Sequence, residues 1–324
     1  MNEIIERELR RVPSDWNNAV GTLRGNEQQL REWLSISPAE QFILVGDQDT
    51  ASLAHWGART LGLISQGVIW GSSEDALLAA DSPPTGSSSS STLVVFLSRR
   101  GGSIDSVKVC RKMDQWFSRN RKIALMSSPG VLSSHADKVV LFDDPELTAT
   151  PTLTPTRLMV ALMTLGAIIT GKDVLTKRAE LLSQWYVEAS ARDFTKMLQN
   201  APGNIRIAAP KRLFSHCLPL KESVENATGR TQDLIDLDGA KPLDEPSTIL
   251  GITAKSSEVQ DLQNLSKLKS DNVEIIAFSS KAPDGKHPHI TLSRRTTDIG
   301  RTIHAMLNIQ KLLLCLSVKG RVAI

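Results

Sequence analysis

The feature that most constrains the fold of this chain is a repeated alternation of short apolar runs with helical patterns. The first run, Phe42-Ile43-Leu44-Val45, is continuously apolar, as expected for a strand buried on both faces of a sheet. An amphipathic helical pattern follows it over Thr50 to Leu63. Strands that alternate with helices predict βαβ units with right-handed crossovers, and therefore a parallel sheet covered by helices.

The same alternation occurs twice along the chain. The first set of expected strands is Phe42–Val45, Gly67–Trp70, Thr92–Leu97, Lys122–Met126 and Lys138–Phe142. The helices expected among them are Thr50–Leu63, Ser73–Ala80 and Ser103–Ser118. Two further helices, expected over Thr156–Thr170 and Asp173–Gln199, follow the first set. The second set of expected strands is Ile205–Ala208, Asp233–Leu237, Ser247–Thr253, Val273–Phe278 and His289–Leu292. Its helices are Leu213–Ala227, Glu258–Lys269 and Thr296–Leu316.

The segment before the first strand is predicted to be helical. A helix is expected over Asn2 to Arg11, and Pro13-Ser14-Asp15 is expected to cap a second helix that begins at Trp16. The complete prediction is an α/β fold with two doubly wound parallel-sheet domains behind an N-terminal helical arm. Its expected boundaries are 1–35 for the arm, 36–155 for the first domain, 156–200 for connecting helices and 201–324 for the second domain.

Charge and composition exclude several classes of function. The 324 residues contain 38 Lys and Arg against 35 Asp and Glu, a balance that argues against a nucleic-acid partner or an anionic membrane surface. Met1 to Arg7 lacks the apolar core of a signal peptide, and Leu158 to Thr170 is too short to span a bilayer. None of the three cysteines forms a C-x-x-C pair, so no metal site is predicted. We therefore expect a cytoplasmic protein without a metal or cofactor.

The segment most informative about function runs from Val94 to Ser106. A buried strand enters the loop Ser98-Arg99-Arg100-Gly101-Gly102-Ser103, which opens a helix. A helix N-terminus presents free N–H groups and the positive end of the helix dipole, which favours an anion such as phosphate. The serines add hydroxyl donors, and the glycines let the backbone approach a ligand closely. The loop matches neither the Walker A nor the G-x-G-x-x-G pattern, so a nucleotide site is disfavoured. The alternative is a capped turn, with Ser103 as the N-cap.

This segment resembles the S-x-S-G-x-[ST]-x-[DE] phosphate loop of sugar isomerase (SIS) domains, which bind phosphosugars on a five-stranded parallel sheet. The resemblance extends to QFILVGDQDTASLAHWGARTL and ALMSSPGVLSSHADKVVLF on either side. The tandem arrangement is similar to the isomerase half of glucosamine-6-phosphate synthase and to the tagatose-6-phosphate ketose/aldose isomerase group. The resemblance is good over residues 1–200 and weak over residues 201–324. It implies a phosphate and sugar site made by Thr50, Ser98, Arg100, Gly101, Ser103 and Ser127.

The resemblance also implies a base and an acid for moving a proton between sugar carbons C1 and C2. The family places a Glu on the first helix of its second domain, and Glu225 matches best, with Glu222 one turn earlier. Glu and His suit this work because their pKa values can be tuned towards neutrality. Any of His216, His287 and His289 is a candidate for opening the sugar ring. Solvated carboxylates and structural histidines are the alternatives for all five residues.

The family resemblance implies an aldose–ketose isomerase or an amino-sugar-phosphate deaminase. A homodimer with sites at the subunit interface is expected, because the family builds its sites across subunits. The alternative is a phosphosugar sensor or regulator without catalysis. Departures from the family pattern favour it. Among them, the family's His-Gly-Pro is replaced by Asp238-Gly239-Ala240-Lys241-Pro242, and its first loop is replaced by the acidic Gly46-Asp47-Gln48-Asp49-Thr50.

Overall fold

The computed structural model describes most of the chain. The described residues are 2–36, 38–62, 68–84, 90–142, 154–171, 204–230, 233–281, 289–292 and 298–318. The predicted helix over Asp173–Gln199 lies outside these ranges. Among the described helices, none is both long and apolar enough to cross a membrane.

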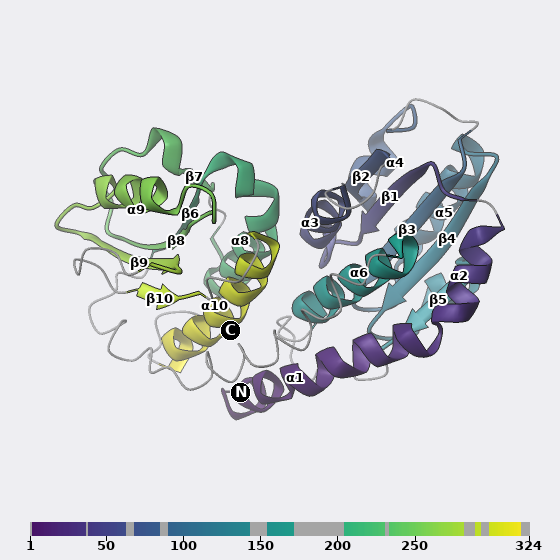
Figure 1. Ribbon diagram of the computed structural model, residues 1–324, viewed down its shortest axis with the longest axis horizontal. Coiled ribbons are helices and arrows are strands. Elements are labelled where there is room, and N and C mark those ends of the chain that lie inside the picture. Colours follow the sequence, from purple (N-terminus) through teal and green to yellow (C-terminus); the bar gives the residue numbers. More distant parts are fainter. Residues whose placement is uncertain are drawn as a thin grey trace. The chain divides into compact units, whose positions relative to one another are not determined.

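The chain divides into two compact units (Figure 1). The first unit comprises Arg11–Ser183, and the second comprises Gln184–Ile324 together with Met1–Arg10. Each unit holds one five-stranded sheet in which every strand pair is parallel. The predicted fold class, α/β with two doubly wound parallel sheets, is confirmed.

The first sheet has the strand order β2-β1-β3-β4-β5. Its strands are β1 (Gln41–Gly46), β2 (Val68–Ser73), β3 (Thr92–Ser98), β4 (Asn120–Met126) and β5 (Lys138–Leu141). Its helices are α3 (Ala51–Gly62), α4 (Glu74–Ala79), α5 (Ile104–Trp116) and α6 (Thr154–Thr170), with a short 3-10 helix, η1 (Val131–Ser134). All residues of β1 and β3 are buried, which explains why their sequences are apolar without alternation.

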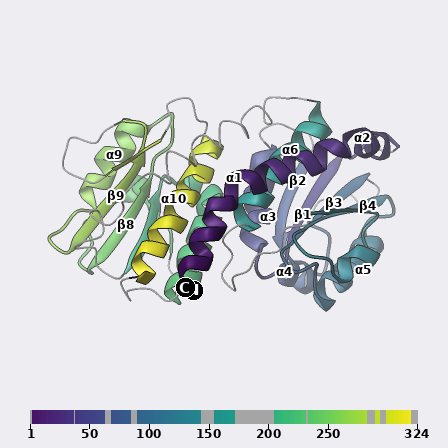
Figure 2. The same ribbon diagram turned by 90° about the horizontal axis from the view of Figure 1, so that it is seen from below.

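Helices cover both faces of the first sheet (Figure 2). On one face, apolar side chains of the central strands, such as Ile43 and Phe96, pack with Leu77 of α4 and Met113 of α5. On the opposite face lie α3 and α6, which pack against each other. Gly57 of α3 lies there so close to Leu44 and Leu162 that a Cβ atom would fall within 2.6 and 2.8 Å of their side-chain atoms.

The second sheet has the strand order β10-β9-β8-β6-β7. Read from the β7 edge, this is the same topology as that of the first sheet. Its strands are β6 (Ile205–Ala209), β7 (Ile235–Asp236), β8 (Ser247–Ile252), β9 (Val273–Ser279) and β10 (His289–Thr291). Its helices are α8 (Phe214–Thr228), α9 (Glu258–Lys267) and α10 (Asp298–Val318), with the short 3-10 helices η2 (Lys211–Leu213) and η3 (Leu237–Gly239). One face packs against α9, and α8 and α10 pack together on the other (Figure 1).

The N-terminal segment differs from the prediction. Instead of a break at Pro13, α1 runs without interruption over Asn2–Gly25, and α2 (Glu27–Ser35) follows. Asp15 does not act as a cap, because its carboxylate forms a buried ion pair with Arg157 of α6, with Nε 2.6 Å from Oδ1. The Ser14 hydroxyl donates to the Arg11 carbonyl at 2.7 Å, one turn back within the same helix. Tertiary contact with α6 thus replaces the expected local cap.

Candidate functional site

The candidate site lies where the strand order of the first sheet reverses. β2 lies on one side of β1 and β3 on the other, so the loops after β1 and β3 leave the sheet in opposite directions. In doubly wound folds, this point at the carboxyl ends of the strands is where ligands bind. The two loops contact each other directly, since the Thr50 hydroxyl donates to the carbonyl of Leu97, the penultimate residue of β3, at 2.7 Å.

The loop from Ser98 to Ser103 owes its shape to two glycines. Gly101 and Gly102 have φ angles of +78° and +89°, a region that side chains with a Cβ atom rarely adopt. At Gly101, a Cβ atom would lie 2.4 Å from the backbone nitrogen of Gly130. The Gly101 carbonyl accepts a hydrogen bond from the Leu132 amide at 3.0 Å, which fixes the loop against η1. The sequence predicts that the glycines let the backbone approach a ligand closely. In the structure, the Gly101 backbone instead lies close to Gly130 and η1 of the chain itself.

Asp47 gathers the polar groups at the base of the site. Its Oδ2 accepts from the Ser98 hydroxyl at 2.7 Å, and its Oδ1 accepts from the Thr50 hydroxyl at 2.8 Å. The Ser98 Oγ in turn accepts from the Gly102 amide at 2.7 Å. Burial raises the pKa of the Asp47 carboxyl, while the Ser98 and Thr50 hydrogen bonds act in the opposite direction.

Ser103 begins α5 with a reciprocal cap. Its Oγ accepts from the amides of Asp105 and Ser106 at 3.1 and 3.2 Å, and the Ser103 amide donates to the Ser106 Oγ at 2.8 Å. Both hydroxyls also donate to Glu74, the first residue of α4. Ser103 Oγ lies 3.2 Å from Glu74 Oε2, and Ser106 Oγ donates to Oε1.

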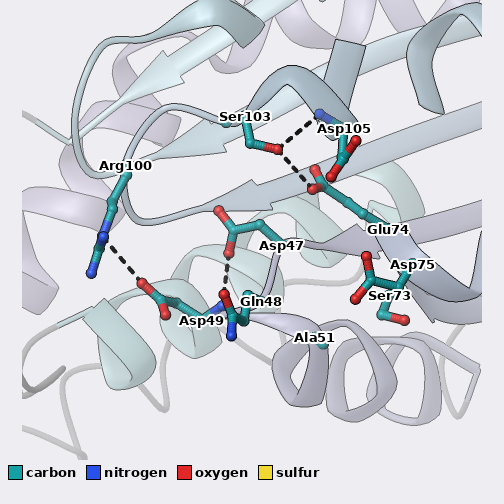
Figure 3. A pocket seen from close by; sticks show the side chains of 11 residues that line it. Asp47, Gln48, Asp49, Ala51, Ser73, Glu74, Asp75, Arg100, Ser103 and Asp105 are labelled. Atoms are coloured by element: carbon teal, nitrogen blue, oxygen red, sulfur yellow. Dashed lines mark hydrogen bonds and ion pairs between the residues drawn. The ribbon is translucent and has the colours of Figure 1, made fainter. Parts of the chain in front are cut away.

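Glu74, Ser103 and Asp105 line a pocket of about 530 Å³ (Figure 3). The pocket is lined by Asp47, Gln48, Asp49, Ala51, Ser73, Glu74, Asp75, Arg100, Gly102, Ser103 and Asp105. Five of these lining residues carry carboxylates and one carries a guanidinium. The lining is therefore strongly acidic, unlike the simple anion site that the loop sequence predicts.

Arginine side chains offset part of this negative charge. Arg100 Nε lies 3.3 Å from Asp49 Oδ2, and Arg99 Nη1 lies 3.8 Å from the same oxygen. The Arg100 side chain is 73% exposed, so this ion pair is weak and can open towards a ligand. Arg99 is buried instead.

The structure brings most of the predicted binding residues to one edge of the sheet but gives them different roles. Arg100 and Ser103 line the pocket. Thr50 and Ser98 are fully buried and hold Asp47, and Gly101 packs on η1. Ser127 is buried at the end of β4, where its amide donates to the Ser98 carbonyl at 3.1 Å.

The predicted catalytic residues lie in the second unit. Glu225 and Glu222 are half-buried on α8, and Glu225 Oε1 forms an ion pair with Lys221 Nζ at 2.8 Å. His216 is buried on the same helix. His289 is the first residue of β10, and His287 lies outside the described residues. Within the described ranges, no three His, Cys, Asp or Glu side chains are grouped so that they could hold a metal ion.

Glu74 is not among the site residues predicted from the sequence. Glu74 directly follows β2, and the carboxyl ends of parallel strands meet at one edge of the sheet. The position of Glu74 shortly after a predicted strand is the sequence signal that could have placed it at the site. The contact itself joins residues 29 and 32 positions apart, so only the sheet order places Glu74 beside Ser103 and Ser106.

No protein-family model matches the chain, and no curated protein matches its sequence. Solved structures do match over nearly the full length. Tagatose-6-phosphate ketose/aldose isomerase from Escherichia coli matches with a TM-score of 0.81 at 15% identity, covering 98% of this chain and 94% of that one. The C-terminal domain of glucosamine-fructose-6-phosphate aminotransferase from Francisella tularensis matches with a TM-score of 0.78 at 12% identity, covering 99% and 97%. Glucosamine-6-phosphate deaminase from Thermotoga maritima matches with 0.66 at 10% identity, covering 93% and 95%. The fold expected from the resemblance to tandem SIS domains is thereby confirmed.

Proposed function

We propose that this chain binds a sugar phosphate, with the phosphate at the loop between β3 and α5. The observation that carries the proposal is the position of this loop. It opens a 13-residue helix at the switch point of the sheet and forms a wall of the pocket. The α5 dipole, the Ser103 hydroxyl and the exposed Arg100 all favour an anion there. The names of the three similar structures each contain a hexose 6-phosphate, which supports the same ligand class.

Binding without turnover, as in a sensor or regulator, agrees best with the described side chains. The carboxylate of Glu225, the predicted base, is held in an ion pair by Lys221, with Oε1 2.8 Å from Nζ. The acidic Asp47 and Asp49 lie in the loop after β1. Glu74 accepts hydrogen bonds from the hydroxyls of Ser103 and Ser106 at the start of α5.

The second candidate is an aldose–ketose isomerase or an amino-sugar-phosphate deaminase, which the full-length likeness to an isomerase and a deaminase favours. In isomerisation, Glu225 would remove the proton from C2 of the open-chain aldose and return it to C1, while the hydroxyl proton moves to the other oxygen. Glu222 is the alternative base, and His216 the candidate for ring opening. The predicted homodimer and cytoplasmic location belong to this proposal too.

A thermal-shift panel tests binding. Glucose, fructose, tagatose and glucosamine 6-phosphates would be compared with the free sugars, since a ligand at about 100 times its Kd stabilises the fold by about 2.7 kcal/mol. We expect stabilisation by at least one phosphate ester and none by its free sugar. If no phosphate ester raises the Tm, the proposed ligand class is wrong.

Turnover separates the two candidates. Isomerisation of each bound ester would be followed by sugar analysis, and deamination by ammonia release. Binding without turnover supports the sensor. If turnover occurs, Glu225→Gln should abolish it, whereas Glu245→Gln, a matched change at an exposed site in the same unit, should not. Light scattering of the purified chain tests the homodimer.

A further inference from the structure

The phosphate loop already holds an anion, and that anion belongs to the chain itself. The Glu74 side chain extends from the start of α4 to the N-terminus of α5, where Oε2 accepts a hydrogen bond from the Ser103 hydroxyl (Figure 3). Its Oε1 accepts a second one from the Ser106 hydroxyl. Ser103 is the N-cap of α5 and Ser106 is its capping-box partner. A carboxylate at this place receives the same hydroxyl donors and the same helix dipole that a bound phosphate would receive.

We propose that Glu74 is an internal competitor of the ligand's phosphate, and that a sugar phosphate binds when this carboxylate leaves Ser103 and Ser106. Glu74 thereby sets the affinity of the site. The inference rests on the proposed sugar-phosphate site and adds its regulation by a residue of the first unit.

Competition follows from charge and space. A phosphate dianion and an ionised carboxylate cannot share two hydroxyls, because like charges at hydrogen-bonding distance repel strongly. Glu74 is 6% exposed, and its side chain lines the pocket of about 530 Å³ into which it can turn. The ligand therefore binds only the fraction of molecules in which Glu74 has turned away, and its apparent Kd rises accordingly.

The surroundings of Glu74 favour its release over permanent capture. Burial raises the pKa of its carboxyl, and the charges of Asp47 and Asp105 raise it further against the hydroxyl hydrogen bonds. Asp47 faces it from the loop after β1, Asp105 from α5 and Asp75 from its own helix. Among the described residues, Arg100 is the one cationic side chain that lines the pocket. A carboxylate among acidic neighbours is a weaker occupant than one paired with a cation.

Asp75 supplies a matched control for the test. It is the next residue of α4, it lines the same pocket, and its side chain is exposed. Removing its charge changes the electrostatics of the pocket without vacating Ser103 and Ser106. The comparison of Glu74 and Asp75 variants therefore separates competition for the hydroxyls from a general reduction of negative charge.

Calorimetric titration with glucosamine 6-phosphate and with inorganic phosphate would compare the wild type, Glu74→Gln, Glu74→Ala and Asp75→Asn. Because a hydrogen bond to a charged group contributes about 1.5–3 kcal/mol, vacating two hydroxyls should tighten binding about tenfold or more in both Glu74 variants. Asp75→Asn should tighten it by less than about threefold, the range expected for an exposed charge. The Glu74→Ala variant keeps the test valid if the amide of Glu74→Gln remains on the hydroxyls.

Three results would overturn the inference. Equal affinity of the wild type and both Glu74 variants would refute competition and leave the proposed sugar-phosphate site intact. Equal tightening by Asp75→Asn would assign the effect to general charge. Absence of binding by every form, including Glu74→Ala, would refute the proposed function together with the inference.

Discussion

Gly101→Ala should destabilise the first unit because the phosphate loop is built on this residue. Alanine at a φ of +78° costs about 1–2 kcal/mol of conformational energy. Its Cβ atom would also lie 2.4 Å from the Gly130 nitrogen and 2.6 Å from the Gly130 Cα, so the backbone before η1 must move. That movement breaks the Leu132–Gly101 hydrogen bond, worth about 1 kcal/mol. We expect a total loss of about 2–3 kcal/mol in the free energy of unfolding.

Urea denaturation followed by tryptophan fluorescence measures this loss, since five of the six tryptophans lie between Arg11 and Ser183. Gly171→Ala is the control. Gly171 has a φ of +68° in the same unit, and no described residue other than its chain neighbours and its own helix backbone has an atom within 4 Å of the position its Cβ would take. It should lose only about 1–2 kcal/mol, the conformational part alone. Equal losses in the two variants would refute the predicted clash with Gly130, and no loss at Gly101 would refute the described loop.

Three further predictions concern the rest of the molecule. Arg157→Met should lower the free energy of unfolding by about 3–5 kcal/mol in the same urea assay, because it removes one partner of the buried ion pair between Arg157 and Asp15; a loss below about 1 kcal/mol would contradict this. Glu74→Gln should flatten the pH dependence of the urea midpoint. Because the pKa of Glu74 is raised in the folded state, its ionisation opposes folding, and wild-type stability should fall as pH rises above the usual pKa of 4.5. An unchanged slope in the variant would contradict this. The thiols of Cys110 and Cys217, whose pKa values burial raises to about 12, should react with a thiol reagent at neutral pH only after unfolding, and rapid reaction in the native protein would contradict their burial.

Much of the fold could be predicted from the sequence because its signals are local. A continuous apolar run such as Phe42–Val45 indicates a strand buried on both faces, and each such run became a parallel strand within a few residues of its predicted ends. The prediction was wrong at Pro13, where α1 continues. The reason is that Asp15 pairs with Arg157, a partner 142 residues away that no local pattern indicates.

The loop of the site could be predicted from the sequence, but the carboxylates that accept hydrogen bonds from its hydroxyls could not. The Ser98–Ser103 segment lies at the expected strand end and opens the expected helix. The sequence does not reveal that Asp47 and Glu74 accept the hydrogen bonds of its hydroxyls, because these contacts depend on β1, β2 and β3 ending side by side. An acidic residue directly after each neighbouring strand is the pattern to look for in such chains.

A crystal structure of the protein with bound glucosamine 6-phosphate would show directly whether Glu74 gives way to the ligand. We expect the phosphate group at the N-terminus of α5, within hydrogen-bonding distance of Ser103, with the Glu74 carboxylate turned away from Ser103 and Ser106. A phosphate bound elsewhere, or a Glu74 carboxylate still on both hydroxyls beside the bound ligand, would contradict it.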